Sequence, residues 1–378
     1  MDTHGESRIS KLQAASDQRW KEQEYLNSEL RDFTNAVSPP PLERSCHTLA
    51  FGAAGTLEAG VAKALFGSFA MPISTGQPYS CTEQYPETPC PWRRKLLIVH
   101  FLCFAVHSIL SVMCLLVSAD KNMDLEIFRV SQSWNVTNSA APGLNGFTFK
   151  MEPFFKVRVD ELTASFFVLS AICHGLWVMA AILSWCSHPW LLNELTRCIA
   201  RCFCWWRFAE YSLSASLMLV LIAVITLTRE YNALLAIFAL TFATMMFGLV
   251  TELASKPDTA GGWATESVFW RLLPHLIGWI PYMAAWSILL TNFFGLLEAQ
   301  GTAPNRVPGF VYAIVFGTFV IFSAFSVVQI RGQWINPNFY HKTELYYCAL
   351  SLTAKLFLGG IVYFSVLRQS SVDEALRG

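Results

Sequence analysis

The clearest pattern in the sequence is a series of seven long apolar runs that begins after the basic stretch at residues 92–95 (WRRK). Each run is long enough to cross a hydrocarbon layer of about 30 Å as a helix. Because a helix satisfies its own backbone hydrogen bonds in lipid, the pattern predicts an all-α bundle of seven transmembrane helices. The expected spans are residues 96–118, 162–185, 203–228, 232–251, 269–293, 309–330 and 345–367.

The longest connection between spans, residues 119–161, alternates apolar and polar residues towards its end. Phe147, Phe149 and Met151 are separated by single polar residues, and the alternation resumes after Pro153. A period of two is typical of strands. We therefore predict a short β-hairpin outside the membrane in this first loop.

The chain divides into three parts by composition. Residues 1–92 are expected to form an N-terminal extension that is partly disordered or amphipathic, 93–368 the seven-helix domain, and 369–378 a short tail. Within the extension, residues 46–73 are small and apolar but include two charges and four glycines. This composition favours a helix lying on a membrane surface over an additional span.

Basic residues set the expected orientation. They precede the first span at residues 93–95 and surround the start of the third span at Arg197, Arg201 and Arg207. The positive-inside rule places both clusters in the cytoplasm, with the N-terminus inside and the C-terminus extracellular or luminal. The glycosylation sequon at Asn135 falls in the first loop, on the outer side in this orientation.

The composition narrows the possible functions. Of the 378 residues, 53% are hydrophobic and only 14% are charged, whereas a soluble domain has about 25% charged residues. Net charge is zero and no basic block is present, so no nucleic-acid partner is expected. Cys198, Cys202 and Cys204 lack the paired spacing of a zinc site, and they favour juxtamembrane packing or acylation. We predict no metal site, and no motif indicates an enzyme.

Lys355 lies near the middle of the last apolar run. A charged amine at that depth costs about 2.5–3.5 kcal/mol on insertion scales, so it is rare and usually functional. A desolvated lysine amine is a nucleophile suited to condensing with an aldehyde, which indicates a Schiff-base chromophore site. The alternative is a lysine that extends to the headgroups, although about ten residues of the run separate it from either end.

A cationic Schiff base needs a buried anion, and Glu210 is the candidate. It lies inside a long apolar segment, whereas the five other glutamates near the spans fall at span ends: Glu161, Glu230, Glu252, Glu298 and Glu344. Arg207 lies three residues earlier on the same helical face, so a local Arg207–Glu210 pair is an alternative.

Other polar residues at membrane depth could serve the same site. Ser214 and Ser351 could exchange hydrogen bonds with a buried ion pair, or could simply be small residues at helix contacts. His107 and His174, in the first two spans, indicate a polar cavity if they are not ordinary core histidines.

Aromatic side chains recur along the fifth and sixth spans. Such stripes are usually bundle core, but a polyene chromophore needs walls of this kind. Helical spacing places three residues on one face of each span: Trp279, Met283 and Trp286 in the fifth, and Phe319, Phe322 and Phe325 in the sixth.

Four segments together resemble the heliorhodopsins, a family of retinal-binding seven-helix photoreceptors. They are residues 210–218 (EYSLSASLM), 233–238 (ALLAIF), 307–312 (VPGFVY) and 350–355 (LSLTAK). The resemblance covers about residues 95–367. It implies all-trans retinal bound to Lys355 as a protonated Schiff base, with Glu210 as the counterion. It also places Ser214 and Ser351 near the Schiff base and His107 and His174 in a polar cavity.

The resemblance further implies a cytoplasmic N-terminus, a homodimer, and a β-hairpin in the first outer loop. The expected function is light sensing, with a slow photocycle that signals to an unknown downstream partner without net ion pumping. A light-gated proton conductor is the alternative.

Overall fold

A computed structural model describes residues 91–134, 147–257, 262–265, 267–300 and 307–377 of the chain. The expectations for the N-terminal extension, including the surface helix at residues 46–73, fall on residues outside these ranges. The same is true of the sequon at Asn135.

Seven long helices confirm the predicted all-α bundle, and all seven are long and apolar enough to cross a membrane. They are α4 (Pro91–Ser118), α5 (Val159–Trp185), α7 (Trp205–Ile225), α8 (Tyr231–Ala254), α9 (Val268–Gln300), α10 (Gly309–Trp334) and α11 (Tyr340–Val362). Several helices continue beyond the apolar run that predicted them, because polar residues at their ends keep the helical hydrogen bonds. The chain is therefore a multi-pass membrane protein.

The predicted hairpin is present, but its strands differ from the expected pattern. Strand β1 (Asp124–Trp134) pairs antiparallel with β2 (Phe147–Arg158), so both alternating stretches around Pro153 belong to one strand. The register shifts between Ile127 and Phe128, opposite Pro153, whose missing N–H interrupts the ladder. The first strand was not identified from its sequence, and the hairpin is longer than predicted.

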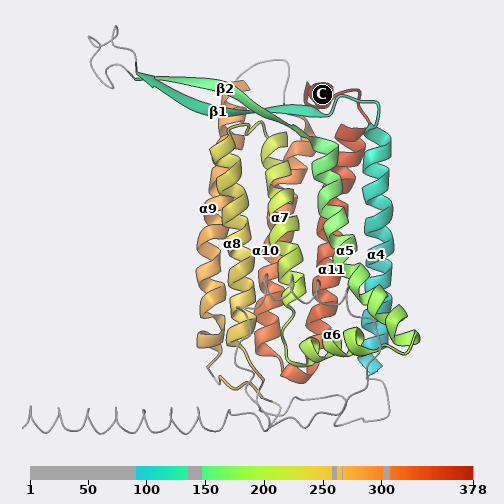
Figure 1. The fold of residues 1–378 in the computed structure, drawn as a ribbon. Helices are drawn as coiled ribbons and strands as arrows, with labels where there is room; N and C mark the ends of the chain where they lie inside the picture. The colour runs from blue at the N-terminus through green and yellow to red at the C-terminus, as the bar shows by residue number, and fades with distance from the viewer. Residues whose placement is uncertain (1–90, 135–146, 258–261, 266, 301–306, 378) are drawn as a thin grey trace, which may run out of the picture. The chain divides into compact units, whose positions relative to one another are not determined.

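The two ends of the bundle carry different structures (Figure 1). The hairpin and the C-terminus lie at one end, and the short helix α6 (Trp190–Ala200) lies at the other. At the hairpin end, the backbone N–H of Phe128 donates to the carbonyl of Arg229 at 2.8 Å. We call these the hairpin end and the α6 end.

The last residues continue the final helix and are packed against the bundle. A short 3-10 helix, η3 (Pro337–Phe339), leads into α11, which ends in a π-helical turn, η4 (Tyr363–Leu367), and α12 (Val372–Arg377) follows. Lys121 donates from Nζ to the carbonyl of Leu367 at 2.7 Å, and Val372 of α12 is buried. The expected tail therefore contains a docked helix.

Helix α7 is the central helix of the bundle. In its most apolar window 78% of the residues are buried, against 22% for the neighbouring α8. A polar side chain on most faces of α7 therefore needs a hydrogen-bond or ion-pair partner within the protein.

Close packing also fixes α11 near Lys355. A Cβ atom at Gly359, one turn after Lys355, would lie 2.4 Å from the ring of Phe167 on α5. Because Gly359 has no side chain, α11 approaches α5 closely at the depth of the lysine.

The three juxtamembrane cysteines at the α6 end are buried, so packing, not acylation, describes them. Cys198 is buried with a small exposed fraction, and Cys202 and Cys204 are completely buried. Burial raises the pKa of the Cys198 thiol to about 12 and also raises the pKa of the Cys202 thiol. Neutral thiols without access to solvent are poor nucleophiles.

Candidate functional site: a buried lysine–glutamate pair

Lys355 and Glu210 form an ion pair in the interior of the bundle. The distance from Lys355 Nζ to Glu210 Oε1 is 3.2 Å, and the two residues are 3% and 7% exposed. Lys355 comes from α11 and Glu210 from the central helix α7. The burial of Lys355 excludes the alternative that its side chain extends to the lipid headgroups.

Two serines complete the polar surroundings of the pair. Lys355 Nζ donates to Ser351 Oγ at 2.8 Å, one turn earlier on α11. Ser170 Oγ, from α5, donates to Glu210 Oε1 at 2.6 Å. Ser170 was missed in the sequence because nothing but its depth in the second span distinguishes it from a packing serine.

Arg207 does not pair with Glu210, which settles the alternative that the sequence left open. Its guanidinium forms ion pairs with Glu252 on α8 and Glu344 on α11, and all three side chains are buried. The hydroxyl of Tyr340 also donates to Glu252. Glu210 is therefore left for Lys355.

The expectation that Glu252 and Glu344 merely end their spans is corrected by this network. Helices α8 and α11 extend past the apolar runs, and Arg207 on the central helix attracts both carboxylates inward. Two carboxylates and one guanidinium leave the network with one excess negative charge when all three groups are ionised. Burying that charge is unfavourable unless hydrogen bonds compensate it, and the backbone N–H of Cys204 supplies one to Glu252 at 3.0 Å.

A cavity of about 330 Å³ adjoins Lys355. It is lined by Ser214, Met218, Phe322 and Ala354, among others. Ser214 is buried, and its Oγ has no hydrogen-bond partner among the residues that the structure describes. An apolar cavity that meets one reactive amine and one unsatisfied hydroxyl fits a mainly hydrocarbon ligand attached to the lysine.

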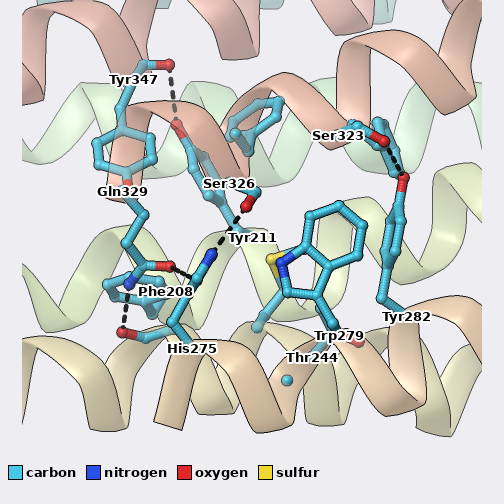
Figure 2. Close-up of a pocket in the computed structure, with 15 residues that line it drawn as sticks. Phe208, Tyr211, Thr244, His275, Trp279, Tyr282, Ser323, Ser326, Gln329 and Tyr347 are labelled. Atoms are coloured by element: carbon cyan, nitrogen blue, oxygen red, sulfur yellow. Dashed lines mark hydrogen bonds between the residues drawn. The ribbon is translucent and has the colours of Figure 1, made fainter. Parts of the chain in front are cut away.

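A second cavity of about 560 Å³ continues from the first, since Tyr211, Met245, Phe322 and Phe325 line both. Trp279 forms part of its wall (Figure 2). The apolar lining therefore extends from Lys355 to the aromatic residues of α9 and α10.

The second cavity also has a polar cluster that the sequence did not indicate. His275 shares hydrogen bonds with Gln329 at 2.9 Å and with Ser326 at 2.7 Å, and Tyr282 with Ser323 at 2.9 Å (Figure 2). These residues lie on α9 and α10, and single histidine or glutamine residues in a span show no pairing by spacing alone.

Not all of the aromatic residues that were expected to line the chromophore cavity do so. Trp286 is buried behind the cavity, with its ring edge-on to Phe319 and Phe322. Met283 is 47% exposed, so the expectation that it shares an inward face with the two tryptophans is wrong. At about 100° per residue, Met283 lies about 40° around the helix from Trp279, in the direction away from Trp286, which places it at the lipid-facing edge of this stripe.

The two predicted histidines meet, and a third joins them. The rings of His107 on α4 and His174 on α5 stack with centroids 5.4 Å apart. His174 Nδ1 also shares a hydrogen bond of 2.7 Å with Nδ1 of His100, whose ring stacks on Trp177 at 4.6 Å. His100 escaped notice because it lies near the start of the first expected span.

The comparison with known families decides what this site belongs to. A family model described as heliorhodopsin matches residues 96–367, well over half of the chain. The chain belongs to the heliorhodopsin family. This heliorhodopsin is therefore a light-responsive rhodopsin with a retinal chromophore, and the resemblance seen in the sequence is confirmed.

Two solved rhodopsins have similar folds at low identity. A crystal structure of thermophilic rhodopsin has a TM-score of 0.49 and 13% identity, over 75% of this chain and 96% of that one. A light-driven proton pump, LR (Mac) from Leptosphaeria maculans, has a TM-score of 0.37 and 12% identity, over 75% and 98%. No curated protein matches this heliorhodopsin in sequence.

Proposed function

We propose that this heliorhodopsin is a light sensor that binds all-trans retinal at Lys355. The observation that carries the proposal is the buried Lys355–Glu210 pair at the edge of an apolar cavity. Retinal, when bound, supplies the visible absorption and the light-driven isomerisation. The residues around it supply the attachment point, the compensating charge and the shape of the cavity.

Each polar neighbour has a definite task in this proposal. Glu210 balances the positive charge at the end of the Lys355 side chain, and Ser170 holds one oxygen of that carboxylate in place. Ser351 and Ser214 can accept or donate a hydrogen bond as that charge moves. His107 and His174 can take up a proton and return it along the same route.

Sensing is favoured over pumping by the state of the other buried carboxylates. The sequence indicated Glu210 as the single deep acid, but the structure also buries Glu252, Glu344 and Asp160. Arg207 binds the first two, and Arg158 lies 2.7 Å from Asp160. Carboxylates that are held in ion pairs with arginine are not free to pass protons to the chromophore, whereas a pump needs donors and acceptors on both sides of it.

The orientation and assembly of the protein are also proposals. The basic residues at 93–95 and around the start of α7 support a cytoplasmic α6 end, and hence an outer hairpin end. Apolar residues exposed on the hairpin, such as Phe149 and Met151, support a homodimer through this strand pair.

The chromophore site is tested by spectroscopy. Protein expressed with all-trans retinal should absorb visible light and be bleached by hydroxylamine, and Lys355→Ala should be colourless. Lys95→Ala, which changes a lysine near the start of α4, is the matched control and should keep the colour. A coloured Lys355→Ala protein would refute the attachment site.

A light-gated proton conductor is the second candidate, favoured by the three histidines that extend from the region of Lys355 towards the α6 end. Patch-clamp recording under continuous light separates the possibilities. A sensor gives no steady current with or without a voltage, and a conductor gives one only under a voltage or pH gradient. A steady current at zero voltage and symmetric pH would mean a pump and overturn the proposal.

A further inference from the structure

A cluster of nitrogen and sulfur donors lies between three helices on the α6 side of the Lys355 pair. One ligand atom from each of His100 on α4, His174 on α5 and Cys348 on α11 lies within 4.8 Å of the others. The two Nδ1 atoms are 2.7 Å apart, and Cys348 Sγ is 3.9 Å from His100 Nε2. Within the described part of the chain, this is the one trio of His, Cys, Asp or Glu placed in this way.

We propose that this trio binds a soft monovalent metal ion, copper(I) or a chemically similar d¹⁰ cation. Thiolate sulfur and imidazole nitrogen are the donors that copper(I) prefers, whereas hard ions such as Mg²⁺ and Ca²⁺ require oxygen. Zinc bound by three protein ligands adds a water as the fourth ligand, whereas all three residues of this trio are buried.

The charge of the site favours a monovalent ion over a divalent one. All three residues are buried, so an uncompensated charge in the cluster is unfavourable. When a monovalent ion binds, it replaces the thiol proton of Cys348, and that proton leaves to water. The net charge of the trio is then unchanged. A divalent ion would add one positive charge beside the Lys355 site.

The geometry requires only side-chain adjustment. Metal–nitrogen bonds of about 2.0 Å and metal–sulfur bonds of about 2.3 Å place the donors of a trigonal site roughly 3.5–3.7 Å apart. The three ligand atoms, one from each residue, now lie within 4.8 Å of one another, so small movements of the side chains bring them to those values. Trp177 stacks on His100 with an angle of 9° between the rings and so restricts rotation of that imidazole about its Cβ–Cγ bond.

The site is separate from the chromophore pair. Cys348 precedes Lys355 by seven residues on α11, which corresponds to about 10 Å along the helix. The metal site shares His174 with the proposed proton route, but it uses neither Lys355 nor Glu210, nor the serines that bind them. The proposal stands or fails independently of the retinal site.

Copper retention tests the proposal directly. The purified full-length protein is equilibrated without oxygen with copper(I) buffered by bicinchoninate, passed through a desalting column, and assayed for bound copper. Wild type should retain one equivalent more than Cys348→Ser or His100→Phe. Cys114→Ser is the matched control, because Cys114 is an equally buried cysteine of α4 far from the trio, and it should behave as wild type.

X-ray absorption at the copper edge of the wild-type protein makes the test independent of how well the variants fold. It should show two nitrogen neighbours and one sulfur neighbour in the additional equivalent. Equal copper retention by wild type and well-folded Cys348→Ser would overturn the proposal, as would a copper site in wild type without sulfur.

Discussion

Replacing Arg207 by methionine tests the buried charge network, because it removes the cation and keeps most of the side-chain length. Glu252 and Glu344 would then face each other without the guanidinium that now lies between them. Neither carboxylate can reach water, since both are buried within the bundle. The variant must either bury uncompensated negative charge or take up protons.

The size of the effect follows from this burial. Removing one partner of a buried ion pair costs about 3–5 kcal/mol. In domains somewhat smaller than this one, each kcal/mol lowers the melting temperature by about 2–4 °C. At the lower end of that range, Arg207→Met should melt about 6–10 °C below wild type.

The measurement is thermal unfolding in detergent, followed by helical circular dichroism at one fixed scan rate because membrane proteins unfold irreversibly. Arg197→Met is the matched control, since Arg197 pairs with Glu194 where both side chains are about half exposed, and it should change stability by at most about 1 kcal/mol. Replacing Glu252 and Glu344 by glutamine in the Arg207→Met background should restore at least half of the loss. A triple variant no more stable than Arg207→Met would refute the charge argument.

Three further predictions concern other parts of the molecule. Glu210→Gln removes the attraction between the carboxylate and the cation on Lys355, about 5 kcal/mol at 3.2 Å and an effective dielectric near 20. Part of the bound chromophore should then lose its proton and absorb in the near ultraviolet at neutral pH. An unchanged spectrum would point to another anion. Gly359→Ala, whose new Cβ would meet Phe167, should lose about 1–3 kcal/mol of stability, whereas Gly360→Ala, which faces open space, should lose none; equal thermal stability of the two variants would contradict the packing. An epitope at the N-terminus should be shielded from antibody in intact cells and one after the last residue accessible, and the reverse labelling would overturn the proposed orientation.

The helices and the ion pair were accessible from the sequence for the same physical reason. Long apolar runs in lipid leave the backbone little choice but a helix, and charges within such runs are too unfavourable to be accidental. Lys355 and Glu210 stand out by depth alone. No knowledge of which helices are neighbours was needed to suggest the pair.

Features that depend on how the helices pack against one another could not be predicted from the sequence. Glu252 and Glu344 seemed to mark span ends, and only the central position of Arg207 shows that they turn inward. His100 acquires a role only because α4 packs beside His174 of α5. Met283 has the periodicity of an inward residue but faces outward, since periodicity alone does not fix the rotation of a helix.

The contacts between α7 and α11 have one more consequence. The two helices point in the same direction, and their ion pairs have opposite polarity: α7 supplies the cation to Glu344 and the anion to Lys355. Sliding one helix along the other would bring like charges together, so the two ion pairs fix the position of α7 along α11. The hydrogen bond from Tyr211 to the Tyr347 carbonyl lies on the α6 side of Lys355. If the charge of the Lys355 pair were neutralised, the Arg207–Glu344 ion pair and the Tyr211 hydrogen bond would still hold α7 and α11 together on the α6 side. The two helices would then be free to separate towards the hairpin end.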